Sequence, residues 1–158
     1  MSELDAKDIE ILRMLKKDSR TPMGLIGDRL DISKATVSRR VARMEDDRII
    51  TGYSLCMDTA SMGVMKSLVM IQIVGSPASM IIDELRNNKE IGHIYKSFGD
   101  HNLVCEVYTH NVDELYEMIQ TRILKMPSVR NVEVDILLEG VDMNADADLE
   151  LYAERFRE

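Results

Sequence analysis

The segment from Ile32 to Met44 restricts the possible folds of this chain more than any other. Val37, Val41 and Met44 recur at the spacing of one helix face, and Ser33 is suited to cap the helix start. The other positions include four basic residues and no acidic one, in a chain of formal net charge −8. A basic helix face with short hydroxyl side chains suits DNA phosphates and base edges. A solvated surface helix is the plainer interpretation of the same pattern.

The charge is divided unevenly along the 158 residues, a length that suits one ordinary domain or two small ones. Residues 1–58 hold 11 basic and 11 acidic residues, whereas residues 59–158 hold 9 basic and 17 acidic ones. Nucleic acid repels an acidic surface. We therefore expect two domains, with any DNA contact confined to the N-terminal third.

Several classes of protein do not fit the composition. No apolar run approaches 18 residues and the N-terminus is charged from Glu3, so we expect neither a membrane span nor a secretory signal, and a cytoplasmic protein. Cys56 and Cys105 lie in apolar, strand-like settings without CxxC spacing, which indicates buried free thiols rather than a disulfide or metal site. No catalytic arrangement of Cys, His, Ser and Asp can be assigned from spacing, and we expect no enzyme and no cofactor.

Two helices are predicted before the basic one, over about 5–17 and 22–30. Asp5 is placed to cap the first of them, with another acid three residues later. Gly27 lies where two helices must cross closely, and Asp31 occupies the turn, where a left-handed residue is often needed. Two helices joined by a short turn form a helix-turn-helix, in which the second helix reads DNA.

Residues 49–58 follow as a predicted strand bounded by turn formers. At this point four motifs together resemble the N-terminal signature of the leucine-responsive (Lrp/AsnC) family of regulators. They are Leu4-Asp5-x-x-Asp8, Asp18-x-Arg20, Ser33-x-x-x-Val37-x-x-Arg40-Val41 and Ile50-x-Gly52-Tyr53, in matching order and spacing. Met57-Asp58 through Met62-Gly63 resembles that family's hinge into its second domain.

The remaining pattern predicts an α+β domain. Strands are expected over 67–74, 91–98, 103–109 and 129–138, with helices over about 76–88 and 111–126. The order βαββαβ indicates a ferredoxin-like sheet with helices on one face. The expected organisation is a winged-type helix-turn-helix domain (1–48), a hinge strand and linker (49–64), a ligand-sensing and oligomerisation domain (65–138), and an acidic tail with a short helix (139–158).

The resemblance implies a sequence-specific transcriptional regulator that binds double-stranded DNA as a homodimer, with possible assembly of dimers into an octamer. It assigns the DNA face to the polar side chains of the basic helix, with Thr36 and Arg39 favoured for bases and Arg43 for phosphate. Arg40 lies nearer the apolar stripe, and a structural role and a phosphate contact stay open for it. The full set is Ser33, Lys34, Thr36, Ser38, Arg39, Arg40 and Arg43.

The resemblance also implies that a small molecule, commonly an amino acid, shifts assembly or DNA affinity. Its candidate site is the turn Gly99-Asp100-His101-Asn102, where the family tends to have Gly-Asp-Tyr-Asp. Asp100 can accept a hydrogen bond from an ammonium group, but the second acid is missing, and Val134 stands where the family often has Thr. We expect an unusual effector or none. Arg48 replaces the Gly that usually follows the reader helix, which demands a strained residue there or a different exit.

Other functions stay open beside this one. A related branch with the same layout resembles sirohaem decarboxylases, but His93, His101 and His110 are dispersed and no Arg/His-rich loop is present. An assembly or ligand-binding protein without DNA binding is the other alternative. Asp142-x-Asn144-x-Asp146 resembles the opening of a calcium loop, but the required Gly and bidentate Glu are absent. Residues 148–156 predict a short apolar-striped helix that packs on its own sheet or on a neighbouring subunit.

Overall fold

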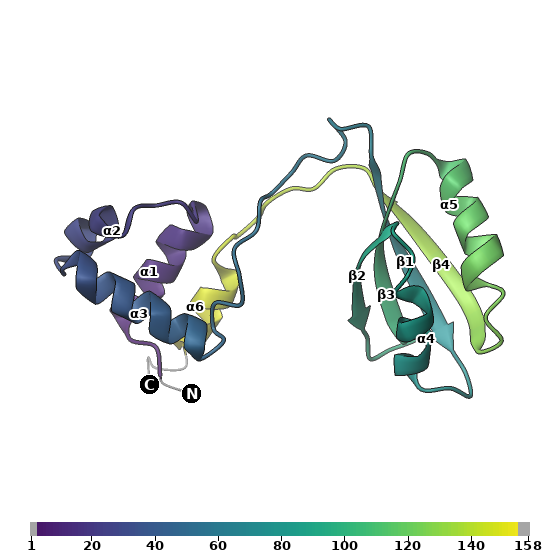
Figure 1. Ribbon diagram of the computed structural model, residues 1–158, viewed down its shortest axis with the longest axis horizontal. Helices are drawn as coiled ribbons and strands as arrows, with labels where there is room; N and C mark the ends of the chain where they lie inside the picture. Colours follow the sequence, from purple (N-terminus) through teal and green to yellow (C-terminus); the bar gives the residue numbers. More distant parts are fainter. Residues whose placement is uncertain (1–2, 155–158) are drawn as a thin grey trace. The chain divides into compact units, whose positions relative to one another are not determined.

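The computed structural model describes residues 3–154, and the chain divides into two compact units (Figure 1). The first unit combines the residues up to Cys56 with those from Val141 onward, and the second unit is Met57–Gly140. No helix within residues 3–154 is long and apolar enough to cross a membrane.

The first unit is a small helical domain with one apolar core. Its helices are α1 (Ala6–Lys17), α2 (Met23–Leu30), α3 (Lys34–Asp46) and α6 (Ala147–Glu154). The three N-terminal helices are those that the sequence predicts. The predicted cap of α1 is present as a reciprocal pair, in which the Asp8 backbone N–H donates to Asp5 Oδ1 at 2.9 Å and the Asp5 N–H donates to Asp8 Oδ2 at 3.1 Å.

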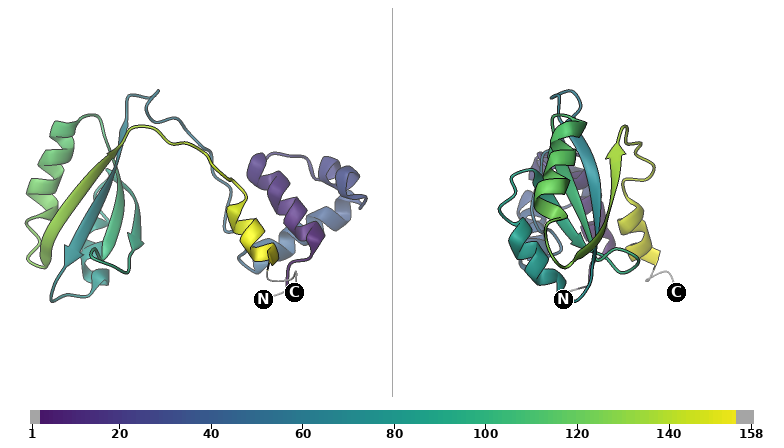
Figure 2. Two further views of the ribbon diagram at one scale, coloured as in Figure 1. Left: turned by 180° about the vertical axis from the view of Figure 1, so that it is seen from behind. Right: turned by 90° about the vertical axis from the view of Figure 1, so that its right-hand side faces the viewer.

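The C-terminal helix α6 belongs to this first unit and packs on α1 (Figure 2). Leu149 is 8% exposed within the same core as α1 and α3. The Leu4 backbone N–H donates to the Tyr152 hydroxyl at 3.1 Å, and Asp148 forms an ion pair with Lys16. Of the two partners expected for this helix, its own sheet or a neighbouring subunit, the sheet was therefore wrong, because Leu149 is buried in the core of the helical domain.

Residues 49–58 differ from the prediction, since no strand forms there. A β-strand requires a neighbouring strand for its backbone hydrogen bonds, and none pairs with this segment within residues 3–154. Leu55 and Met57 are 82% and 60% exposed. Cys56 is exposed as well, so its predicted burial was wrong, whereas Cys105 is buried as predicted.

The second unit has the predicted ferredoxin-like fold. Its elements are β1 (Met65–Ile73), α4 (Ala78–Leu85), β2 (Ile91–Lys96), β3 (Leu103–Thr109), α5 (Val112–Met118), a π-helix η1 (Ile119–Ile123) and β4 (Val129–Leu137). The antiparallel sheet has the order β2-β3-β1-β4. Both α4 and α5 cover one face of it (Figure 2), and alternate residues of β1 and β3 are buried beneath them.

The helix expected over 111–126 keeps its predicted Asn111 cap but changes form at Ile119. From there the Leu124 N–H donates to the Ile119 carbonyl at 2.9 Å, five residues back. The Thr121 hydroxyl donates to the Glu117 carbonyl oxygen at 2.7 Å, and this bond competes with the regular helical hydrogen bond at this point. A wider π-turn therefore leads into β4.

Candidate nucleic-acid interface

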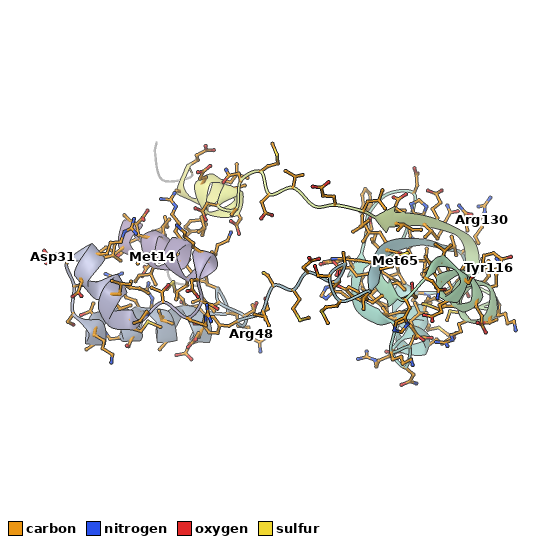
Figure 3. The ribbon with its side chains drawn as sticks, turned by 90° about the horizontal axis from the view of Figure 1, so that it is seen from above. Met14, Asp31, Arg48, Met65, Tyr116 and Arg130 are labelled. Atoms are coloured by element: carbon orange, nitrogen blue, oxygen red, sulfur yellow. The ribbon has the colours of Figure 1, made fainter. Side chains whose placement is uncertain are left out.

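The turn between α2 and α3 is fixed by backbone contacts. A Cβ atom added at Gly27 would lie 2.5 Å from the Ile32 carbonyl oxygen, so only glycine fits the close approach. Asp31 adopts the left-handed conformation with φ 53°, and the Ile32 N–H donates to the Gly27 carbonyl at 3.0 Å. The predicted roles of Gly27 and Asp31 are confirmed. The turn therefore sets the direction in which α3 leaves α2 (Figure 3, where Asp31 is labelled).

The start of α3 is capped by the predicted residue. The Ser33 hydroxyl accepts from the Thr36 backbone N–H at 3.1 Å and lies 2.9 Å from the Thr36 hydroxyl. Both hydroxyl groups are therefore engaged at the cap. The structure places Thr36 half-buried at this position, apart from the outward face of the helix.

The end of α3 shows the strain that the sequence predicts for Arg48, which lies in the left-handed region with φ 57°. The Ile49 N–H donates to the Met44 carbonyl at 2.8 Å and the Arg48 N–H to the Glu45 carbonyl at 3.0 Å. These two bonds form a Schellman motif, with arginine at the position where glycine is usual. The exit of α3 is thus of the common type, with a strained residue in place.

One buried carboxylate of α1 ties α3 in place. Val37, Val41 and Met44 pack inward as predicted, at 0%, 4% and 0% exposed. Beside them the Asp8 side chain is fully buried and accepts from Arg40 Nη1 at 2.8 Å and from Arg43 Nη2.

Asp5 adds a second carboxylate, 2.7 Å from the same Nη1 atom of Arg40. Burial works to raise the pKa of Asp5, but the Asp8 backbone N–H and the Arg40 guanidinium hold that pKa below its ordinary value. The pKa of Arg40 is raised, first by its hydrogen bond to Asp8 and then by its bond to Asp5. The structure therefore gives Arg40 a structural role. Arg43, the residue favoured for phosphate, is likewise bonded to Asp8.

The outward face of α3 is formed by a different set of side chains. Lys34, Ser38 and Arg39 are exposed, and none of the three side chains bonds to another residue in the described range 3–154. Ala35 and Ala42 are exposed between them. Of the predicted DNA-binding residues, Lys34, Ser38 and Arg39 are thus the exposed ones of α3 whose side chains bond to no other residue in the described range.

Sequence reasoning missed two parts of this site. Ala35 and Ala42 fall on the outward face opposite Val37 and Val41, and helical spacing alone can reveal that position. The sequence does not predict the partner of Arg40 and Arg43 on α1, because the cap of that helix explains Asp8 equally well.

The turn predicted to hold an effector lies in the second unit. Asn102 fastens it to β1: its backbone N–H donates to the Ile71 carbonyl at 2.9 Å, and its Oδ1 accepts from the Ile73 N–H at 2.6 Å. Gly99 and Asp100 are exposed, and the Asp100 carboxylate bonds to no residue within the described range. Asn102 is therefore structural, and Asp100 is the open acceptor of the turn.

His101 points to β4, the edge strand on the far side of β1. Its Nε2 lies 3.3 Å from Glu133 Oε1 on β4, with the histidine side chain 18% exposed. The other histidines are elsewhere, and His110 Nδ1 lies 3.0 Å from Glu114 on α5. Among residues 3–154 no three His, Cys, Asp or Glu side chains gather in a way that holds a metal ion.

Comparison with known families assigns a description to each unit. Residues 4–51 match the description "winged helix-turn-helix DNA-binding", and residues 66–146 match "Lrp/AsnC ligand binding domain". The transcriptional regulator LrpA of Pyrococcus horikoshii is 32% identical over 139 residues, covering 86% of this chain and 97% of LrpA. The regulatory protein AsnC of Haemophilus influenzae is 27% identical, covering 89% of this chain and 95% of AsnC.

Solved structures agree with the fold. A transcriptional regulator from Neisseria meningitidis, crystallised in complex with L-methionine, superimposes with a TM-score of 0.79 at 17% identity. The match covers 89% of this chain and 93% of that protein. AsnC of Escherichia coli gives a TM-score of 0.77 at 22% identity, covering 89% of this chain and 96% of AsnC.

Proposed function

Because the chain belongs to the Lrp/AsnC family of DNA-binding transcriptional regulators, we propose that α3 is the helix that reads its DNA. The observation that carries this proposal is the outward face of α3, where Lys34, Ser38 and Arg39 are open and no acid lies between Ile32 and Met44. Residues at the start of such a helix contact base edges in the major groove. Lys34 and Arg39 supply donors for phosphates and bases.

The test is a titration of the full-length protein on its own upstream DNA at two salt concentrations, with Arg39→Ala beside the wild type. We expect wild-type affinity to fall with salt, and Arg39→Ala to bind the site about 5- to 150-fold more weakly, the range for one specific base contact. Arg86→Ala is the matched control, because Arg86 is an exposed arginine of α4's end in the second unit. Binding no tighter than to random DNA, or equal loss in both variants, contradicts the proposal.

A second copy is proposed to cover the open face of the sheet. The face away from α4 and α5 presents the half-buried apolar side chains of Leu68, Met70 and Val104 in adjacent register positions, beside the acids Glu133 and Asp135 of β4. Near the start of β1, Lys66 Nζ on this face pairs with Glu106 Oε2 at 3.1 Å. An apolar sheet face of this kind needs a partner. A dimer formed through it supplies two copies of α3 for half-sites about one helical turn apart, and octamers are assemblies of such dimers.

Sedimentation of the wild type and of Leu68→Asp tests this dimer. We expect the substitution to shift the protein towards monomer, because a buried charge without a partner is costly. Asp83→Lys, at an exposed position of α4, is a suitable control. Glu133→Lys is a less informative control, because it lies on the same sheet face as Leu68. An unchanged mass for Leu68→Asp contradicts the proposed interface.

We also propose that a small zwitterion, an amino acid by its chemistry, acts at the Gly99–Asn102 turn. The open carboxylate of Asp100 supports this, since an ammonium group needs such an acceptor. The wild type and Asp100→Asn are to be titrated with the twenty amino acids, L-methionine included, by calorimetry. Heat of binding that disappears in Asp100→Asn is expected. Absence of binding by every amino acid makes the protein an effector-independent regulator.

The enzyme and the DNA-independent assembly protein are the alternatives. We propose that neither applies, on the strength of the α3 surface and of the regulators to which the chain is similar. Absorbance after incubation with a haem-type tetrapyrrole separates the decarboxylase-like enzyme from a regulator. The salt titration described above separates the assembly protein.

A further inference from the structure

The side chains that α3 leaves open are few and chemically simple, and this limits the DNA sequence that they can recognise. Of its three arginines, Arg40 and Arg43 are bonded to the buried carboxylate of Asp8. Arg39 is the arginine of α3 that stays exposed without a partner in the described range. Guanine is the base that an arginine fork recognises best, through its O6 and N7 atoms.

Two methyl groups flank Arg39 on the same face. Ala35 lies four residues before it and Ala42 three residues after it, and both are exposed. An exposed alanine methyl in the major groove contacts the C5 methyl group of thymine. Because Ala35, Ser38 and Ala42 are small, the backbone of α3 can approach the base edges closely along this face.

The spacing of these residues sets the span of the contact. Seven residues separate Ala35 from Ala42, which is about 10 Å along a helix axis, or about three base-pair steps. Beyond Ala42 the next exposed residues of α3 are two acids, Glu45, whose carboxylate accepts from the Tyr53 hydroxyl at 2.9 Å, and Asp46. Phosphate repels their negative charges, so the reading face ends there.

We propose that α3 recognises, in each half-site, a guanine that lies between two thymines within about four base pairs, with Arg39 on the guanine and the methyl groups of Ala35 and Ala42 on the thymines. The thymines can lie on either strand. Ser38 contributes a hydroxyl beside Arg39 that accepts or donates and so tolerates several bases. This inference rests on the proposed function of α3 and names the DNA that it takes.

The first step of the test is selection of binding sites from random double-stranded DNA by the full-length protein. The expected result is a repeated motif that contains the guanine and both thymines. Failure to select any motif overturns the proposed function and this inference together. A motif without the guanine overturns the inference alone and leaves α3 as a reader of other bases.

The second step changes the DNA and leaves the protein intact. Replacing the guanine with 7-deazaguanine removes one acceptor, and we expect about a tenfold loss of affinity. Replacing each thymine with deoxyuridine removes one methyl group, for which about a three- to fourfold loss is expected. Equal affinity for the altered and unaltered sites overturns the assignment of the base concerned.

Arg39→Lys then separates geometry from charge. Lysine keeps the positive charge but lacks the planar fork, so we expect loss of preference for guanine with little change in affinity for random DNA. Arg86→Lys in the second unit is the matched control. If Arg39→Lys binds the selected site as tightly as the wild type, a guanine contact by Arg39 is overturned.

Discussion

The two units orient their helices by different means. In the second unit, alternate apolar residues of β1 and β3 lie under α4 and α5, and Ser67 and Thr109 are the buried polar residues of that core in the described range. In the first unit, a fully buried carboxylate on α1 holds two arginines of α3. In the helical unit, ion pairs therefore help to position a helix. In the sheet unit, apolar packing has that role.

This difference has a consequence for DNA binding. The ion pairs of Arg40 and Arg43 with Asp5 and Asp8 align α3 and also neutralise two of its four positive charges. Fewer free charges means fewer phosphate contacts and a weaker non-specific affinity. The open face of α3 is thereby left to side chains that discriminate between bases.

The largest effect is expected from Asp8→Asn. This change removes the buried negative charge that Arg40 and Arg43 share, so that Arg40 keeps only Asp5 and Arg43 has no carboxylate partner in the described range. We expect the first unit to lose about 3 kcal/mol of stability, at the lower end for breaking a buried ion pair because both arginines keep some solvent contact. Urea unfolding, followed by hydrogen exchange of peptides from α1 and from β3, measures the loss in each unit.

Asp83→Asn is the control for this change, since Asp83 forms an exposed pair with Arg86 in the second unit. It should alter stability by less than about 0.5 kcal/mol. An equal loss in both variants, or a loss in β3 after Asp8→Asn, removes the contrast between the units.

The next effect is expected at Gly27. Its added Cβ would meet the Ile32 carbonyl oxygen at 2.5 Å, so Gly27→Ala must displace the turn before α3 and should cost about 2 kcal/mol. Gly24→Ala on the same helix meets nothing within 4 Å and should stabilise α2 by about 0.5–1 kcal/mol. Thermal unfolding of the two variants gives the comparison, and the same sign of change in both contradicts it.

How far the sequence predicts this molecule depends on the separation of the interacting residues. The cap of α3 joins residues three apart, and the turn at Asp31 is equally local, so both were predictable. The pairs of Asp8 with Arg40 and Arg43 join residues 32 and 35 apart, and the pair of Lys16 with Asp148 spans 132. No local pattern marks such pairs.

The effector turn shows the same limit in the second unit. Its four residues were identified from a local motif, but the contacts of Asn102 with β1 and of His101 with β4 come from strands distant in the sequence. The absence of the predicted strand over 49–58 has the opposite cause. Its sequence favours a strand, but pairing depends on a partner that residues 3–154 do not provide.

An effect of similar size to that at Gly27 is expected from Leu149→Ala on α6. Leu149 is 8% exposed against α1, and its truncation should destabilise the first unit by about 2 kcal/mol, at the low end for a leucine at the edge of a core. Leu151→Ala on the same helix is the matched control, because Leu151 is 67% exposed and should change stability by less than about 0.5 kcal/mol. Hydrogen exchange of α1 reports the difference, and equal exchange in the two variants shows that α6 adds nothing to the first unit.

The smallest effect concerns the reactivity of the two thiols, one in each unit. Burial raises the pKa of Cys105 to about 11, whereas Cys56 is exposed. The thiolate is the reactive form, so at pH 8 an aromatic disulfide reagent should titrate one thiol rapidly and the second only after unfolding in urea. Raising the pH towards 11 should speed the second reaction, because it increases the thiolate fraction of Cys105. In Cys56→Ser the rapid phase should vanish and the slow phase should persist. Two rapid thiols in the native wild type at pH 8 would mean that the sheet core opens as readily as the segment that carries Cys56.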